Sequence, residues 1–172
     1  MLKTARAAML ASAVLAGASS VAIAKPIEFP SRVAYEPLAA KLTASGGSPD
    51  RIVHVKQAAD LDRLESGRRY KFVVDAHGAI AVAPLPADAP SNEYVHPILA
   101  GGAPVLTAGG IRVDRVNGKV EHVIVDQDSK SYCPTSESLS EAARALASLG
   151  IPPAAIKMES HPPQCAPRVR QK

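Results

Sequence analysis

The sequence predicts an α+β domain with a mainly antiparallel sheet of hairpins and two helices. Two hairpin patterns support this prediction, a short one in residues 70–83 and a longer one in residues 111–126. Apart from these strands, helical spacing of apolar residues extends from Ala58 to Leu64 and from Ser136 to Leu149. The chain has 172 residues, 47% of them apolar, which is enough for one domain with a modest core.

The first 24 residues have the organisation of a secretory signal peptide. Lys3 and Arg6 precede a short apolar run, and Ala22-Ile23-Ala24 matches the small-x-small pattern of a cleavage site. Serines and a glycine interrupt the run before it reaches the roughly 20 apolar residues that a membrane-spanning helix needs. We therefore expect cleavage after Ala24, no stable membrane insertion afterwards, and a mature protein in the periplasm or the extracellular medium.

Residues 25–50 contain several prolines and glycines and are predicted as an extended arm with a short helix near residues 38–42. A single α+β domain is expected over residues 51–160. It begins with a β-branched run at residues 52–55, and the first helix follows. Gly67 stands where a C-cap glycine belongs, so this helix should end before it.

The first hairpin is predicted by two apolar stretches in residues 70–83 that are joined by a His-Gly turn. The second is predicted more strongly, because Asn117-Gly118 accepts the two positive φ values of a type I′ turn. Between the hairpins we expect a short strand near Val105. The glycine pairs at 101–102 and 109–110 are interpreted as turns or bulges, since they lack the strand-to-helix setting of a nucleotide-binding loop.

The C-terminal helix is predicted to begin at Thr135 or Ser136 and to end at Gly150. Its apolar residues recur with helical spacing, so one face should pack against the sheet. A last edge strand is expected near residues 155–158. The tail, residues 161–172, contains prolines and a basic end and is expected to be flexible.

Composition limits the classes of function. The formal net charge is only +4, and signal cleavage would remove two positive charges, so we expect no nucleic-acid partner. Aromatic residues make up 3% of the chain, which leaves few platforms for stacking bases. The sequence contains no G-x-S-x-G, G-x-x-x-x-G-K-[ST], H-E-x-x-H or C-x-x-C motif. No cofactor is assigned, and whether the protein is an enzyme stays open.

Cys133 and Cys165 are the two cysteines of the chain, and we predict that they form a disulfide. Exported proteins fold in an oxidising compartment, where a cysteine pair is more often a disulfide than a metal site or a nucleophile. Closing a loop of this length is worth roughly 3–4 kcal/mol in the chain-entropy model. The alternative is a metal site in which His161 joins both cysteines. Three candidate ligands are a weak signal, so no metal is expected.

Two regions contain candidate ligand-binding residues. His96 precedes a proline beside a glycine-rich bend, a setting that can hold its ring in a fixed orientation. Residues 129–134 gather hydroxyls, an amine and a thiol before a helix N-terminus, where unpaired N–H groups favour anions. We take His96, Ser129, Ser131 and Tyr132 as the candidates. In the alternative interpretation, the hydroxyls form caps and turns and Tyr132 packs against the sheet.

These residues belong to a longer pattern, close to H-x-x-L-x-x-G-x-P-V-x-x-A-G, then a hairpin, then S-G-H-Y-x-P and a helix that ends in Gly-Ile. The matching residues are His96, Leu99, Gly102, Pro104, Val105, Ala108, Gly109, Ser129, Tyr132, Pro134, Leu139, Gly150 and Ile151. The pattern resembles a poorly characterised small domain of bacterial secreted and polymorphic-toxin proteins of the RHS type. The resemblance covers about half of the chain. It implies the kind of protein in which such a domain occurs, but no particular reaction.

The chain departs from this pattern at one informative place. Where the pattern has Gly-His, this sequence has Lys130-Ser131. A general acid/base histidine at that position, if the family uses one, is therefore absent, which weakens a catalytic interpretation.

Two hypotheses of function follow. In the first, the chain is an exported, non-catalytic module that binds another exported protein or a small ligand through the region of His96 and residues 129–132. In the second, it is a toxin-like secreted enzyme, a transferase or hydrolase, that uses His96, Ser131 and Tyr132. The geometry discriminates between them, because an enzyme needs two or three of these side chains converging on one concave pocket.

Overall fold

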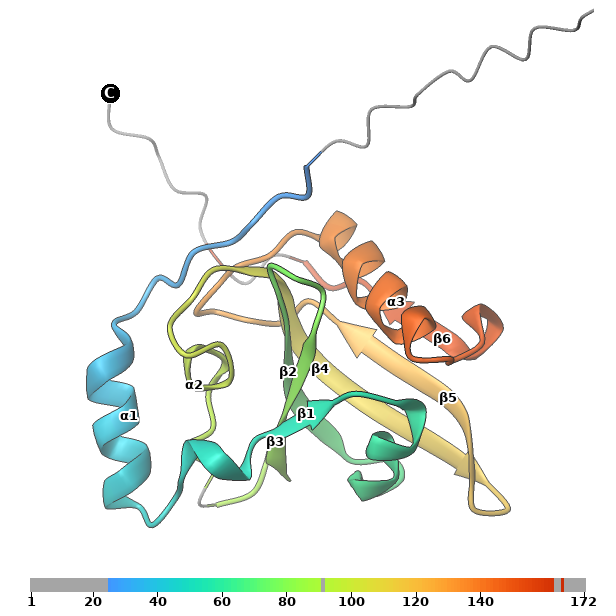
Figure 1. Ribbon diagram of the computed structural model, residues 1–172, viewed down its shortest axis with the longest axis horizontal. Helices are drawn as coiled ribbons and strands as arrows, with labels where there is room; N and C mark the ends of the chain where they lie inside the picture. The colour runs from blue at the N-terminus through green and yellow to red at the C-terminus, as the bar shows by residue number, and fades with distance from the viewer. Residues whose placement is uncertain (1–24, 91, 163–164, 166–172) are drawn as a thin grey trace, which may run out of the picture.

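The computed structural model describes residues 25–90, 92–162 and 165. The predicted signal peptide and most of the predicted tail lie outside these residues. One twisted sheet runs through the molecule, with α3 over one face and with α1 and α2 over the other (Figure 1). The predicted α+β class is confirmed.

The described part of the chain contains one six-stranded sheet in the order β1-β3-β2-β4-β5-β6. The strands are β1 Val53–Val55, β2 Arg69–Asp75, β3 Ile80–Pro86, β4 Val105–Val116, β5 Lys119–Asp126 and β6 Ile156–Glu159. Neighbouring strands are antiparallel, except that β6 runs parallel to β5. This parallel edge requires a crossover, which α3 provides. The sheet is thus mainly antiparallel, as predicted.

The described residues contain more helices than the two of the domain and the short one of the arm that the sequence predicted. The α-helices are α1 Tyr35–Ala44, α2 His96–Leu99 and α3 Leu139–Ser148, and the 3₁₀ helices are η1 Pro49–Arg51, η2 Ala58–Arg63, η3 Ser136–Ser138 and η4 Pro153–Ala155. The first predicted helix is therefore a 3₁₀ helix. The second is α-helical only from Leu139, after the turn η3.

The helix α2 was not predicted, because its prolines and glycines indicated a loop. Pro97 lies in its first turn, where a missing N–H costs no intrahelical hydrogen bond. Gly101 and Gly102 end the segment with φ values of +58° and +79°, so this pair is a turn as predicted. The arm also contains more helix than predicted, since α1 extends well beyond residues 38–42.

Both predicted hairpins are present. Asn117 and Gly118 have φ values of +52° and +78°, as a type I′ turn requires. The strand expected near Val105 is continuous with the first strand of the second hairpin. Gly109 and Gly110 consequently lie inside β4, and their interpretation as turns or bulges is wrong.

Apolar clusters bury both faces of the sheet. The larger cluster lies beneath α3 and η2 and includes Phe72 of β2, while the smaller lies beneath α1 and α2 and includes Val73. Successive residues of a strand face opposite sides, so Arg69 and Lys71 share the face of Val73. The charged start of β2 is thereby placed beside the smaller cluster.

The predicted disulfide between Cys133 and Cys165 is confirmed, with a Cα–Cα distance of 5.9 Å. It closes a loop that contains α3 and β6 and fastens the tail to the segment after β5. Within the described ranges, no helix is long and apolar enough to cross a membrane. The same residues contain no group of three or more His, Cys, Asp or Glu side chains placed to hold a metal ion.

Candidate functional site

A buried polar junction connects α2, β4 and the segment after β5. The Nε2 atom of His96 lies 3.0 Å from the carbonyl oxygen of Gly109, and its Nδ1 atom lies 3.1 Å from the hydroxyl of Ser129. His96 is 8% exposed and Ser129 is 3% exposed. The structure therefore brings together two of the four candidate residues and holds the histidine ring at both nitrogens.

The partners of His96 determine its tautomer. A carbonyl oxygen only accepts hydrogen bonds, so Nε2 carries the proton and Nδ1 accepts from the Ser129 hydroxyl. Burial lowers the pKa of His96 to about 4, and the hydrogen bond to Gly109 only partly offsets this effect. The imidazole is neutral at neutral pH. Ser129 donates to it as a nucleophilic serine donates to a base, but burial of both side chains keeps a substrate from reaching them.

Tyr132 is packed into the smaller apolar cluster and is 2% exposed. Its hydroxyl donates a 2.8 Å hydrogen bond to the carbonyl oxygen of Ala103, and burial raises its pKa to about 12. Ser131 is half-buried, and its carbonyl oxygen accepts from the backbone N–H of Arg32. Among the described contacts, neither the Ser131 nor the Tyr132 side chain meets His96, so the three groups of the enzymatic hypothesis do not form a hydrogen-bonded set.

The segment of residues 127–133, here called the anchored loop, is held at nearly every position. Besides the contacts of Ser129, Ser131 and Tyr132, the backbone N–H of Cys133 donates to Ser129, and the disulfide fixes the end of the loop. At its start, the Gln127 side chain bonds to the backbone of His161. Lys130 lies at the exposed tip. The anchored loop is thus held rigidly and presents the exposed side chain of Lys130.

A second polar group, which the sequence analysis missed, adjoins the loop. Arg69 donates from Nε and Nη2 to the two carboxylate oxygens of Asp126 at 2.9 and 2.8 Å. The side chain of Asp126 is 7% exposed, and its carboxylate also accepts from the backbone N–H groups of Gly110 and Asp128. Arg69 further lies 3.5 Å from the Asp128 carboxylate. The ion pair of Arg69 and Asp126 connects β2 and β5 across β4.

The acidity of Asp126 reflects these contacts. Burial alone would raise its pKa, but the hydrogen bonds from Arg69, Asp128 and Gly110 outweigh burial and hold the pKa below its ordinary value. The carboxylate is therefore ionised at neutral pH and neutralised locally by Arg69.

The glycines of β4 make this arrangement possible. A Cβ atom on Gly110 would overlap the Arg69 guanidinium and the Asp126 carboxylate, and one on Gly109 would overlap the backbone at Asp126. Glycines inside a strand often mark such close approaches. The Gly109-Gly110 pair was therefore the available sequence signal for the missed site, but locating it required the strand to be recognised as continuous.

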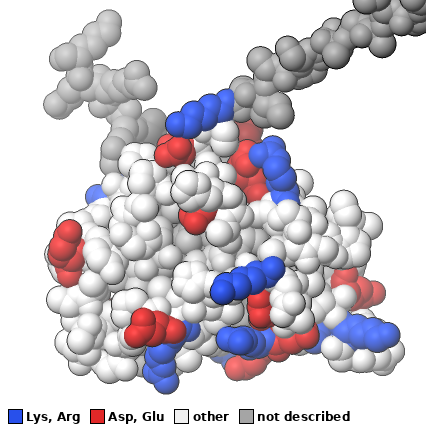
Figure 2. Space-filling view, viewed as in Figure 1, with Lys and Arg blue, Asp and Glu red and all other residues white. Residues whose placement is uncertain are grey.

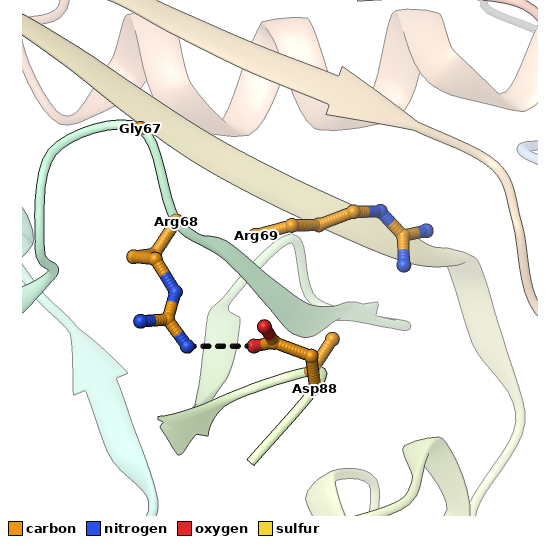
Figure 3. A pocket seen from close by; sticks show the side chains of 5 residues that line it. Gly67, Arg68, Arg69 and Asp88 are labelled. Carbon is orange, nitrogen blue, oxygen red and sulfur yellow. Dashed lines mark hydrogen bonds and ion pairs between the residues drawn. The ribbon is translucent and has the colours of Figure 1, made fainter.

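The surface beside Arg69 contains an open hollow of about 460 Å³, lined by Gly67, Arg68, Arg69, Ala87 and Asp88. Arg68 donates to the Asp88 carboxylate at 2.8 Å across the hollow, and Arg69 extends away from that pair (Figure 3). None of the four candidate residues from the sequence lines this hollow. On the face shown in Figure 2, positive and negative side chains are interspersed without a patch of one sign.

Comparison of the chain with protein-family models, curated proteins and solved structures finds no match.

Proposed function

We propose that the chain is an exported, non-catalytic module that binds another exported protein or a small ligand on the surface around the anchored loop. The observation that carries this proposal is the fixation of that loop. Four of its side chains, those of Gln127, Ser129, Tyr132 and Cys133, are committed to internal bonds while Lys130 stays exposed. A preorganised surface loses little conformational entropy on binding, which favours affinity.

The contacts of the candidate residues support a binding role over a catalytic one. Both nitrogens of His96 and the hydroxyl of Tyr132 are satisfied by the protein itself. A general base must instead present a free nitrogen or oxygen to the proton that it removes. The buried junction therefore acts in this proposal as scaffolding for the loop.

Export is supported by the disulfide, since such bonds form and persist in oxidising compartments. Mass spectrometry of the protein from the periplasmic and secreted fractions tests this part of the proposal. The expected N-terminus is Lys25, and an intact Met1 in the membrane fraction would contradict it.

Binding is tested by capture from the exported fraction with matched charge reversals. We expect the wild-type protein and Lys119→Glu to retain the same partner, because Lys119 lies at the distant hairpin turn. Lys130→Glu should lose that partner while melting at the wild-type temperature. Equal retention by both variants would exclude the anchored loop as the binding surface.

A further inference from the structure

Arg69 and Lys71 present two cations side by side on β2. They are separated by one residue, so their side chains leave the same face of the strand. In the register with β4, Lys71 lies opposite Gly110, and the Arg69 guanidinium lies directly over that glycine. The two cations are therefore close enough for the charge of Arg69 to act on Lys71, and Arg69 adjoins Asp128 of the anchored loop.

Lys71 has no partner for its charge among the described residues. Its side chain is half-buried, yet no carboxylate or carbonyl of those residues lies within bonding distance of Nζ. The carboxylate whose charge acts on it belongs to Glu93, and that group is already held by Lys41 at 3.0 Å. Burial lowers the pKa of Lys71, and the charge of Arg69 lowers it further. An ammonium group in this setting retains three unused donors.

Arg69 supplies a second, oriented donor. Its Nε and Nη2 atoms are committed to Asp126, whereas Nη1 has no bond among the described contacts and the side chain is 38% exposed. The ion pair fixes the guanidinium before any ligand arrives, which removes the entropy cost of ordering it.

We propose that Arg69 Nη1 and Lys71 Nζ bind the oxyanion group, a carboxylate or a phosphate, of a small ligand. This inference rests on the proposed function and names the chemistry of its ligand. An oxyanion would accept charge-assisted hydrogen bonds from both cations and compensate the unpaired charge of Lys71. A half-buried, unpartnered lysine costs stability in the free protein, and such a cost is expected where a group serves binding.

The test uses the folded mature protein and two probes, inorganic phosphate and succinate, with sodium chloride at matched ionic strength as the control. Lysine side-chain NMR signals are followed during each titration. We expect the Lys71 signal to shift saturably with at least one probe and its pKa to rise in the complex. Tighter binding of phosphate indicates a phosphorylated ligand, and tighter binding of succinate indicates a carboxylate. A response equal to that of sodium chloride with both probes would overturn the proposal.

Variants separate the site from general charge effects. Lys71→Met should bind the probe at least about tenfold more weakly, because hydrogen bonds to charged groups contribute more than this factor. It should melt at or above the wild-type temperature, and Lys119→Met should bind normally. Persistence of the response in Lys71→Met would place the anion elsewhere and refute the site. Because this titration needs no protein partner, its failure is distinguishable from failure of the capture experiment.

Discussion

Acidification should weaken the fold through protonation of His96. The unfolded chain has an ordinary histidine pKa of 6.5, whereas the buried ring has a pKa of about 4. Between these pH values the histidine binds more protons in the unfolded state than in the folded state. The contribution of His96 to stability is therefore fully present above the unfolded-state pKa and is lost as the pH falls toward the folded-state pKa. Linkage gives a loss of about 2 kcal/mol in the free energy of unfolding between about pH 7 and about pH 5.

Protonation of Asp126 does not contribute to the loss of stability between these two pH values. Its pKa is lowered in the folded state, so its contribution is present above the ordinary aspartate pKa of 3.8 and is lost only at lower pH. Urea denaturation of the wild-type protein and of His96→Gln at the two pH values isolates the histidine. His96→Gln should be less stable at neutral pH but should lose much less on acidification. The exposed His77→Gln should behave as the wild type. An equal loss of stability in wild type and His96→Gln would refute the reasoning.

Three further changes test the packing around the site. Gly110→Ala should lower the free energy of unfolding by about 3 kcal/mol, because the new methyl group displaces the partly buried ion pair of Arg69 and Asp126. In the same urea titration, Gly118→Ala should cost only about 1–2 kcal/mol of turn strain, since its Cβ meets no atom within 4 Å. Cys133→Ser should cost about 3 kcal/mol and lower the melting temperature, and a wild-type protein with two titratable thiols would contradict the disulfide. Tyr132→Phe should lower the free energy of unfolding by about 1 kcal/mol, because the hydrogen bond to Ala103 is lost. Tyr132→Ala should lower it by roughly 3–5 kcal/mol. A thermal melt in which Tyr132→Phe is the less stable of the two variants would contradict the packing of this ring.

Local signals predicted much of this fold correctly. The Asn117-Gly118 turn requires positive φ values that few other pairs accept, and the strands on both sides of it alternate clearly. The disulfide was predictable because the chain contains a single pair of cysteines and a candidate export signal. The parallel pairing of β6 was not predictable in this way, since it depends on where α3 returns the chain rather than on residues 156–159 themselves.

The candidate site was predicted only in part. The sequence pointed to His96 and Ser129, and the structure places them in contact. It did not point to the Arg69–Asp126 pair, because the two residues are separated by 57 positions and meet only through strand order. For Tyr132 the sequence left two interpretations open, a ligand-binding hydroxyl or a ring packed against the sheet, and in the structure the ring is packed in the smaller apolar cluster. Burial of a single side chain depends on the path of the backbone, which local composition does not reveal.

The disulfide joins the C-terminal segment to the rest of the protein by a covalent bond in addition to the backbone. A protease that cuts once between Cys133 and Cys165 would therefore produce two chains that stay joined. The exposed prolines that follow α3 lie within this interval. Such a nicked molecule would retain β6 at the edge of the sheet and would separate only after reduction. A single cut in this part of the protein therefore does not release the C-terminal piece, and its release also requires a thiol reductant that breaks the disulfide.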